Sequence, residues 1–294
     1  MIRNIAERAV LVLSWTLTAM LCAVVLVFVG YLLINSLPGL GMELIFGAVP
    51  PLDALLGRAR VFDGIFAALA GTLLLVAGST ALAVPTGVAA GIYLAEYASP
   101  SIKRLFGFFF DLLAGIPSIV IGLFGFSVAI FLHQRFSGRI GPCLLISAMS
   151  LAFLVLPYVI RSTQVALENV PATIRKTAPA LGATRLQNIV HVLVPRALAG
   201  IVSGIMLAIG RCAEDTAVIM LTGVVATAGV PRSPLSSFEA LPFYIYYISS
   251  QYTDPAELSR GYGACLILMA TCALLFMLAY SIQRSLTYRS LFRL

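Results

Sequence analysis

Six long runs of apolar residues alternate with short polar segments along this chain. They cover residues 10–34, 65–94, 112–131, 144–160, 197–225 and 264–281. A helix needs about 20 apolar residues to cross the hydrocarbon core of a bilayer, which is about 30 Å thick. The pattern therefore predicts an all-α polytopic membrane protein with six transmembrane helices. The first run follows Arg3 and Arg8, exceeds the apolar part of a signal peptide and precedes no small-x-small cleavage site, so we expect a retained anchor.

The composition fits a protein surrounded by lipid. Hydrophobic residues make up 60% of the 294 positions and charged residues only 11%, against roughly 45–50% and 25% in soluble domains. The net charge of +7 does not indicate a nucleic-acid partner, because the basic residues lie between the apolar runs and form no single face. The five cysteines form no CxxC pair, and we interpret them as core residues, without disulfides or metal ligation.

Basic residues predict the orientation of the spans. With a cytoplasmic N-terminus, segments 1–9, 95–111, 161–196 and 283–294 lie inside and hold twelve basic residues. The opposite loops hold six, which are Arg58, Arg60, Arg135, Arg139, Arg232 and Arg260. Cytoplasmic loops carry the excess of Lys and Arg in membrane proteins. Both termini are therefore predicted to be cytoplasmic.

Glycine and proline interrupt the second and third runs at Gly71, Gly78, Pro85, Gly87, Pro117 and Gly122. In membranes they allow close helix packing, or a local break that faces protein or a water-filled path. Both interpretations stay open for each residue, and the concentration favours a conduit. Segments 35–64 and 226–263 are too long for tight turns. The second carries aromatic residues that suit either the headgroup level or an external partner: Phe243, Tyr244, Tyr246, Tyr247 and Tyr252.

The sequence lacks the motifs of the common catalytic sites. Its two lysines, Lys103 and Lys176, do not follow a glycine, so the chain has no P-loop of the GK[ST] type. His133 and His191 lie in loops on opposite sides of the membrane and lack metal-ligand spacing. A GxSxG motif is also absent. We therefore expect a protein that is not an enzyme and holds no metal or cofactor of its own.

Three charged residues inside the fifth run are the strongest departure from an apolar span. Arg211, Glu214 and Asp215 each cost about 2.5–3.5 kcal/mol near the centre of a bilayer. On a continuous helix Arg211 reaches Glu214 at i+3 and Asp215 at i+4, so the three can partly neutralise one another. A structural ion pair is one interpretation. A solvated pathway or gate is favoured, because charges inside spans usually face a cavity or the bundle interior.

The segment over residues 161–196 carries five basic residues and one acid, and it is too long for a simple turn. Pro171 near its start and Gly182 after an apolar stretch predict a short cytoplasmic helix between them. The basic residues could hold this helix on anionic lipid. We favour the alternative, in which the helix docks on a soluble partner.

This segment resembles the cytoplasmic loop of ABC-importer membrane subunits, which reads E-A-A, three residues, G, nine residues, then I-x-L-P. The corresponding residues are Lys176-Thr177-Ala178, Gly182 and Val192-Leu193-Val194-Pro195. The spacing is kept. Lys176 and Thr177 replace the Glu and the first Ala of the pattern.

Further stretches resemble the PstA type of phosphate permease. They are GIYLAEY from Gly91, GIPSIVIG from Gly115, LGATR from Leu181 and LPFYIY from Leu241. The A-R-A-x-G-E-T-A segment of that family reads GRCAEDTA from Gly210. Arg211 matches the Arg of the family, whereas Glu214 replaces its Gly and Asp215 its Glu. The resemblance extends over about residues 65–284.

The resemblance implies a type I ABC importer (MetI-like) permease core in the bacterial inner membrane, transporting inorganic phosphate. The implied partners are a second homologous permease subunit, an ATPase dimer that holds ATP and Mg²⁺, and a periplasmic phosphate-binding protein. The implied translocation pathway includes Arg211, Glu214, Asp215, Thr216, Pro117 and Ser118. The implied surface for ATPase coupling includes Arg175, Lys176, Ala178, Gly182, Ala183 and Pro195.

The expected domain organisation has three parts. Residues 1–64 form an anchor helix and a periplasmic segment, 65–284 form the permease core with its coupling loop over 161–196, and 285–294 form a cytoplasmic tail. Other functions remain open at this stage: a permease for another oxyanion such as phosphonate or molybdate, a secondary transporter that works alone with the three charged residues as a proton relay, or a membrane scaffold or sensor.

Overall fold

The computed structural model describes residues 2–55, 61, 64–136 and 140–292. Within this part of the chain, six helices are long and apolar enough to cross a membrane: Glu7–Ser36, Phe66–Glu96, Ser118–Arg135, Leu144–Glu168, Arg185–Glu214 and Pro255–Ser285. The prediction of an all-α protein with six spans is confirmed. Three basic residues used to predict the topology, Arg58, Arg60 and Arg139, lie outside the described residues.

The spans belong to α1 (Ile2–Ser36), α4 (Phe66–Glu96), α6 (Ser118–Arg135), α7 (Leu144–Glu168), α10 (Val194–Glu214) and α13 (Pro255–Phe292). Helices α7 and α13 extend well beyond the apolar runs that predict them. Hydropathy detects the part of a helix that lies in hydrocarbon, whereas the backbone continues to make helical hydrogen bonds past the first charged residues.

The third span differs from its prediction. Residues 112–131 were expected to form one helix after a cytoplasmic loop over residues 95–111. The structure instead places α5 (Pro100–Ala114) before α6, so that most of the expected loop is helical. Pro117 stands immediately before α6, and its missing N–H and restricted φ separate the two helices.

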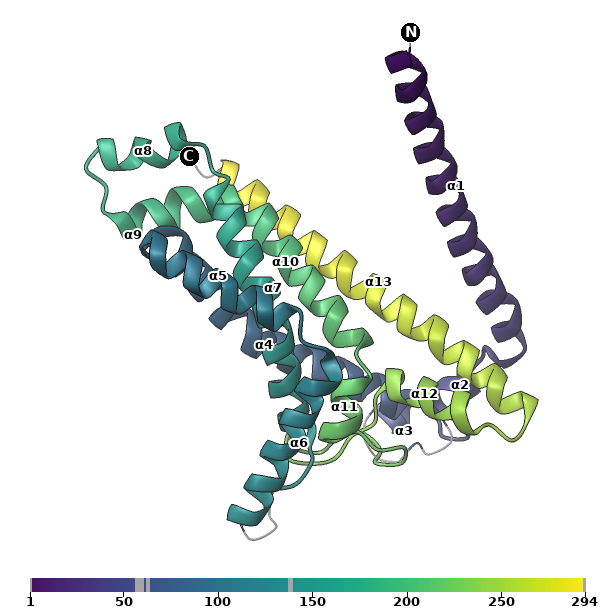
Figure 1. Cartoon of the computed structure of the whole chain (residues 1–294). Coiled ribbons are helices and arrows are strands. Elements are labelled where there is room, and N and C mark those ends of the chain that lie inside the picture. The colour runs from purple at the N-terminus through teal and green to yellow at the C-terminus, as the bar shows by residue number, and fades with distance from the viewer. Residues whose placement is uncertain (1, 56–60, 62–63, 137–139, 293–294) are drawn as a thin grey trace.

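The core lies where α4 packs along α7 and α10 (Figure 1). Leu151, Val155 and Val159 of α7 are fully buried at its centre. Helix α1 stands apart from this bundle and approaches α13 near its own end (Figure 1). There the rings of Tyr31 and Tyr262 pack edge to face with centroids 5.8 Å apart. The largest buried cluster of the bundle thus contains no described side chain of α1.

The two ends of the bundle have different structures. Figure 1 shows both termini and the connection between α7 and α10 at one end, which we call the inner end. At the other, the outer end, lie η1 (Leu37–Gly39), α2 (Met42–Phe46), α3 (Pro51–Leu55) and α12 (Leu241–Gln251). The long segments predicted between the spans therefore contain short helices.

The connection from α7 to α10, which we call the inner loop (residues 169–193), contains α8 (Ala172–Ala180), α9 (Arg185–Asn188) and the π-helical turn η2 (Ile189–Leu193). The short helix predicted between Pro171 and Gly182 is confirmed as α8. Gly182 has φ +84°, a conformation that favours glycine after a helix. Helix α9 and η2 were not predicted.

Candidate functional site

The fifth span is broken at the charged residues predicted to lie inside it. Helix α10 ends at Glu214, and α11 (Ala217–Thr222) begins after Asp215 and Thr216. Asp215 has an extended backbone with φ −73° and ψ 116°. Its Oδ1 accepts a hydrogen bond of 2.8 Å from the N–H of Val218, and the residue is buried. Asp215 therefore caps α11, as Asp commonly does at the start of a helix.

Arg211 pairs with Glu214. The Nη1 of Arg211 lies 3.0 Å from Oε1 of Glu214, and the two side chains are 42% and 61% exposed. Asp215, placed at i+4 from Arg211 on a continuous helix, does not form an ion pair with it, because the helix ends before Asp215 and its carboxylate is turned into α11. The exposed charges are thus a neutral pair. Within a span, charges exposed on one chain are expected to face a protein partner or a water-filled path.

The break before α6, at Pro117, lies close to the break between α10 and α11. One turn into α6, a Cβ placed on Gly122 would lie 3.1 Å from the carbonyl oxygen of Ala217 and 3.1 Å from Cα of Val218. This close approach holds the start of α6, with Pro117 and Ser118, against the start of α11. The structure therefore brings together the helices that follow the two breaks.

Tyr158 of α7 is a site residue that the sequence did not single out. Its hydroxyl donates a hydrogen bond of 3.3 Å to the carbonyl oxygen of Ala114, at the end of α5. A tyrosine beside Pro157 in an otherwise apolar run was the available signal in the sequence. Tyr158 thus joins α7 to the end of α5, next to the break before α6.

The predicted coupling residues differ in where they point. Lys176 is exposed on α8, whereas Arg175 is turned inward. Arg175 forms an ion pair with Glu96, and its Nη2 donates a hydrogen bond of 2.6 Å to the carbonyl oxygen of Leu167. Ala178 lies in the last turn of α8, and its carbonyl oxygen accepts the N–H of Ala183 at 3.1 Å.

Pro195 stands in the first turn of α10, beyond the inner loop. Two apolar residues of this loop that the sequence did not single out as coupling residues are strongly exposed. Leu181 is 84% exposed and Leu186 is 63% exposed. Their signal in the sequence was an apolar residue in an otherwise polar, basic segment. Large apolar side chains at this level of exposure indicate a contact surface for another protein.

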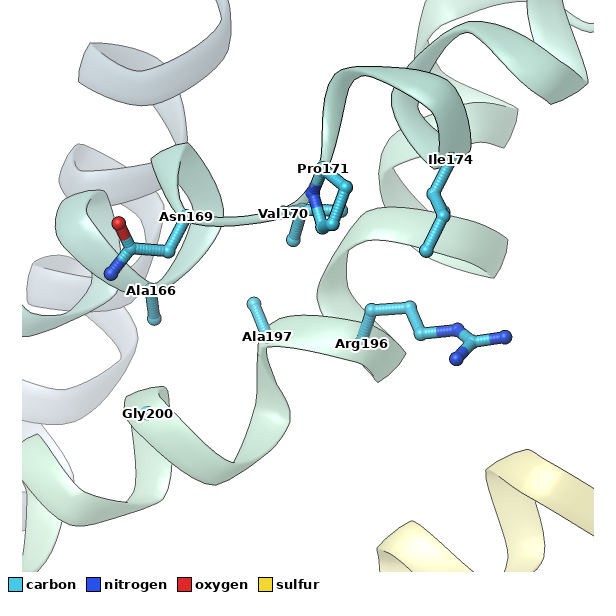
Figure 2. Close-up of a pocket in the computed structure, with 8 residues that line it drawn as sticks. All are labelled: Ala166, Asn169, Val170, Pro171, Ile174, Arg196, Ala197 and Gly200. Atoms are coloured by element: carbon cyan, nitrogen blue, oxygen red, sulfur yellow. The ribbon is translucent and has the colours of Figure 1, made fainter.

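A groove lies beneath α8, where the inner loop leaves α7 and enters α10 (Figure 2). Its volume is about 360 Å³. Ala166, Ala197 and Gly200 line one side of the groove, and Ile174 reaches down from α8 on the other (Figure 2). Arg196 extends beneath Ile174 at its edge (Figure 2). The underside of α8 therefore faces open space over part of its length.

Ligation of a metal has no support in the described ranges. Across them, no three His, Cys, Asp or Glu side chains come together as a metal site would require. The ring Nδ1 of His133 is hydrogen-bonded with the carbonyl oxygen of Ile140 at 3.0 Å, and that of His191 with the carbonyl oxygen of Gln187 at 3.1 Å. Both histidines thus make local backbone contacts.

Comparison with known proteins gives consistent matches. The family model described as "Binding-protein-dependent transport system inner membrane component" matches residues 87–289. The chain is 32% identical over 247 residues to the phosphate transport system permease protein PstA of Haemophilus influenzae, covering 83% of each protein. It is 35% identical over 233 residues to PstA 1 of Mycobacterium tuberculosis, covering 77% of this chain and 72% of the relative.

Solved structures share the fold. Two crystal forms of the inward-facing MetNI methionine ABC transporter match with TM-scores of 0.54 and 0.58, at 21% and 18% identity. The first covers 81% of this chain and 99% of the solved chain, and the second 76% and 97%. At this identity the likeness shows a MetI-type helical arrangement.

Proposed function

The chain belongs to the family of binding-protein-dependent transport system inner membrane components and is a membrane permease of an ABC importer, for which we propose inorganic phosphate as the transported ion. It is a transport subunit and not an enzyme. The relatives named as phosphate transport permeases support this substrate. The family also implies an ATPase and a binding protein as partners.

The exposed Arg211–Glu214 pair beside the break at Asp215 is the main structural support for phosphate as the transported ion. A guanidinium presents several N–H donors to the oxygens of an oxyanion. Glu214 holds Arg211 when no ion is present, and the neutral pair keeps the site weak. A weak site suits passage, because a strongly cationic pocket would retain the ion. Thr216, Pro117 and Ser118 line the same path, where broken helices leave backbone groups free to face water.

The remaining partners complete this arrangement. A second homologous permease subunit covers the exposed pair, so that the path runs between the two chains. The ATPase acts as a dimer that carries ATP and Mg²⁺, and the binding protein delivers phosphate at the outer end. Residues 65–284 form the permease core, residues 1–64 an anchor with a periplasmic segment, and residues 285–294 an inner tail.

Uptake by the reconstituted transporter tests the substrate and the role of Arg211. Liposomes holding the complete complex, with ATP inside, should accumulate radioactive phosphate, and excess phosphonate or molybdate should not compete. Arg211→Ala removes a charge-assisted contact worth about 1.5–3 kcal/mol, which corresponds to a fall in uptake of roughly 10- to 150-fold. The complex should still assemble, and Glu214→Gly, which restores the family residue, should be tolerated, because a single guanidinium without its partner is still a weaker site than a cluster of basic residues.

Two outcomes would contradict this assignment. If this chain alone moved phosphate along a proton gradient, it would be a secondary transporter. If Arg211→Ala prevented assembly and a hydrophobic replacement of Arg211, Glu214 and Asp215 together restored transport, the pair would be structural only.

We propose that the inner end is cytoplasmic and that α8, Gly182 and Leu181 contact the ATPase. A cysteine at Lys176, on the exposed face of α8, and one at Ser250, on α12 at the outer end, form a matched pair in a background without native cysteines. An impermeant maleimide added to intact cells should label the second and not the first. The reverse pattern would invert the topology.

A further inference from the structure

The end of α4 is held by two arginines of the inner loop. Arg175 of α8 donates from Nη1 to the carboxylate of Glu96, the last residue of α4. Arg185, the first residue of α9, donates from Nη2 to the backbone carbonyl of Glu96. Its guanidinium also lies over the ring of Tyr97, 4.6 Å from the centroid. We call these contacts of Arg175 and Arg185 with Glu96 and Tyr97 the Glu96 clamp.

The Glu96–Arg175 pair of the clamp is enclosed, whereas Arg185 and Tyr97 lie on the exposed side. The side chain of Glu96 is only 8% exposed and that of Arg175 is 27% exposed. The second nitrogen of Arg175 is used as well, on the carbonyl of Leu167 at the end of α7. A charge pair with most of its hydrogen bonds satisfied and little water around it holds one geometry.

Apolar packing beneath α8 is sparse by comparison. Helix α8 has no buried residue, and Ile174 is only partly buried against the cluster below it. The groove of about 360 Å³ lies under the same helix (Figure 2). A force applied to α8 therefore reaches the core through the ion pair more directly than through packed side chains.

Helices α4 and α7 pack so closely that they are expected to move together. On α4, a Cβ placed on Gly87 would lie 2.8 Å from Cβ of Val159, and one on Gly91 would lie 2.6 Å from Cβ of Thr163. The backbones of α4 and α7 thus touch along their inner halves. A displacement of Glu96 moves α4 and α7 together, and α10, which carries Arg211, packs against both of these helices.

We propose that Glu96 is a positioning residue through which motion of α8 and α9 reaches the spans, so that the Glu96 clamp couples ATP hydrolysis to opening of the path. This rests on the proposed role of the inner loop as the element that contacts the ATPase. Glu96 does not touch the transported ion. It transmits the movement because it joins both short helices of the loop to one turn of α4.

Charge exchange in the complete transporter tests the clamp. The variants are Glu96→Lys, Arg175→Glu and the double variant, in liposomes with radioactive phosphate and ATP. Each single variant places like charges together, and we expect the phosphate moved per ATP hydrolysed to fall at least about tenfold, with the ATPase still bound and active. The double variant restores the opposite charges and should recover at least about half of the wild-type ratio. Asp111→Asn, in the ion pair between α5 and α7, is the control and should leave the ratio unchanged.

The results separate the clamp from the proposed function. If the wild type moved no phosphate, the substrate would be wrong whatever the variants did. If the wild type moved phosphate and both single variants kept its ratio, the clamp would not transmit the motion. If the single variants released the ATPase and the double variant failed to recover it, Glu96 would only shape the loop, and the proposal would be overturned.

Discussion

The outer end and the inner end of the core are held together by different kinds of bonds. At the outer end, residues 223–241 run back across the bundle and bond to it mainly through backbone groups. The N–H of Leu144 donates to the carbonyl of Ser236 at 3.0 Å, and that of Leu145 to the carbonyl of Pro234 at 2.8 Å. The N–H of Leu241 donates to Oγ1 of Thr72 at 2.9 Å. At the inner end, long charged side chains attach α8 and α9 to Glu96.

The difference indicates which end moves. Buried backbone hydrogen bonds fix the chain itself, and breaking one leaves an unpaired group that costs about 1–3 kcal/mol. An ion pair between long side chains allows a short helix to move as a unit while its attachment is kept. We infer that the outer end is the fixed part of the permease and the inner loop its movable part.

Crowding the outer end should have the largest effect. A Cβ on Gly71 of α4 would lie 2.0 Å from the carbonyl oxygen of Glu239, and this neighbour is backbone that cannot rotate away. Gly71→Ala should therefore destabilise the protein by about 1–3 kcal/mol through overpacking, more than the helix gains from alanine. Thermal unfolding in detergent, followed by size exclusion, measures the change.

Gly30→Ala is the matched control for this variant. It also replaces a helical glycine, but its Cβ would meet nothing within 4 Å. It should leave the unfolding temperature unchanged or raise it slightly. Equal stability of Gly71→Ala and the wild type would show that the outer end yields easily, and the contrast between the two ends would be lost.

A bulky side chain on the inner loop should impair transport without unfolding the protein. A Cβ on Gly182 would meet nothing within 4 Å, so a side chain there points into open space. The positive φ alone costs a non-glycine residue about 1–2 kcal/mol. Gly182→Trp should lower the phosphate moved per ATP by about tenfold, because its bulk stands on the surface that we assign to the ATPase.

Gly182→Asn separates bulk from backbone conformation, since asparagine tolerates a positive φ. It should transport nearly as the wild type does. Normal coupled transport by Gly182→Trp would show that the ATPase contact lies elsewhere, and both variants should appear in the membrane in normal amounts.

The sequence was sufficient for features that depend on composition or on one backbone conformation. All six spans follow from apolar runs, because crossing hydrocarbon requires about 20 such residues whatever their partners. Gly182 was predicted as the stop of α8 because the residue after a helix often needs a positive φ. These properties are local, so neighbouring residues suffice to reveal them.

Features that depend on a distant partner were not predictable in the same way. Arg175 turns inward because Glu96, 79 positions earlier, lies beneath it. Asp215 caps α11 and does not pair with Arg211, because the helix ends one residue earlier. A shift of one residue in a helix end changes which carboxylate faces the path, and helical spacing alone treats Glu214 and Asp215 alike.

The smallest predicted effect concerns the pH dependence of the outer end. Burial raises the pKa of the Glu239 carboxyl above its ordinary value of 4.5, and hydrogen bonds from the N–H groups of Gly229 and Ala228 only partly offset this rise. The folded state then binds the proton more tightly than the unfolded chain does. The stabilising contribution is fully present below pH 4.5 and is lost as the pH rises through the higher folded value.

Glu239→Gln should remove this dependence and keep the loop closed, because its amide oxygen can still accept the N–H of Gly229, which now lies 2.7 Å from Oε1. Between pH 4.5 and 7, the unfolding temperature of the wild type should fall relative to that of Glu239→Gln, by on the order of 2 °C. Glu43→Gln, at an exposed carboxylate of the same end, should follow the wild type. Parallel curves for all three proteins would mean that Glu239 titrates as an exposed group, and that the outer end is as open to water as the inner loop.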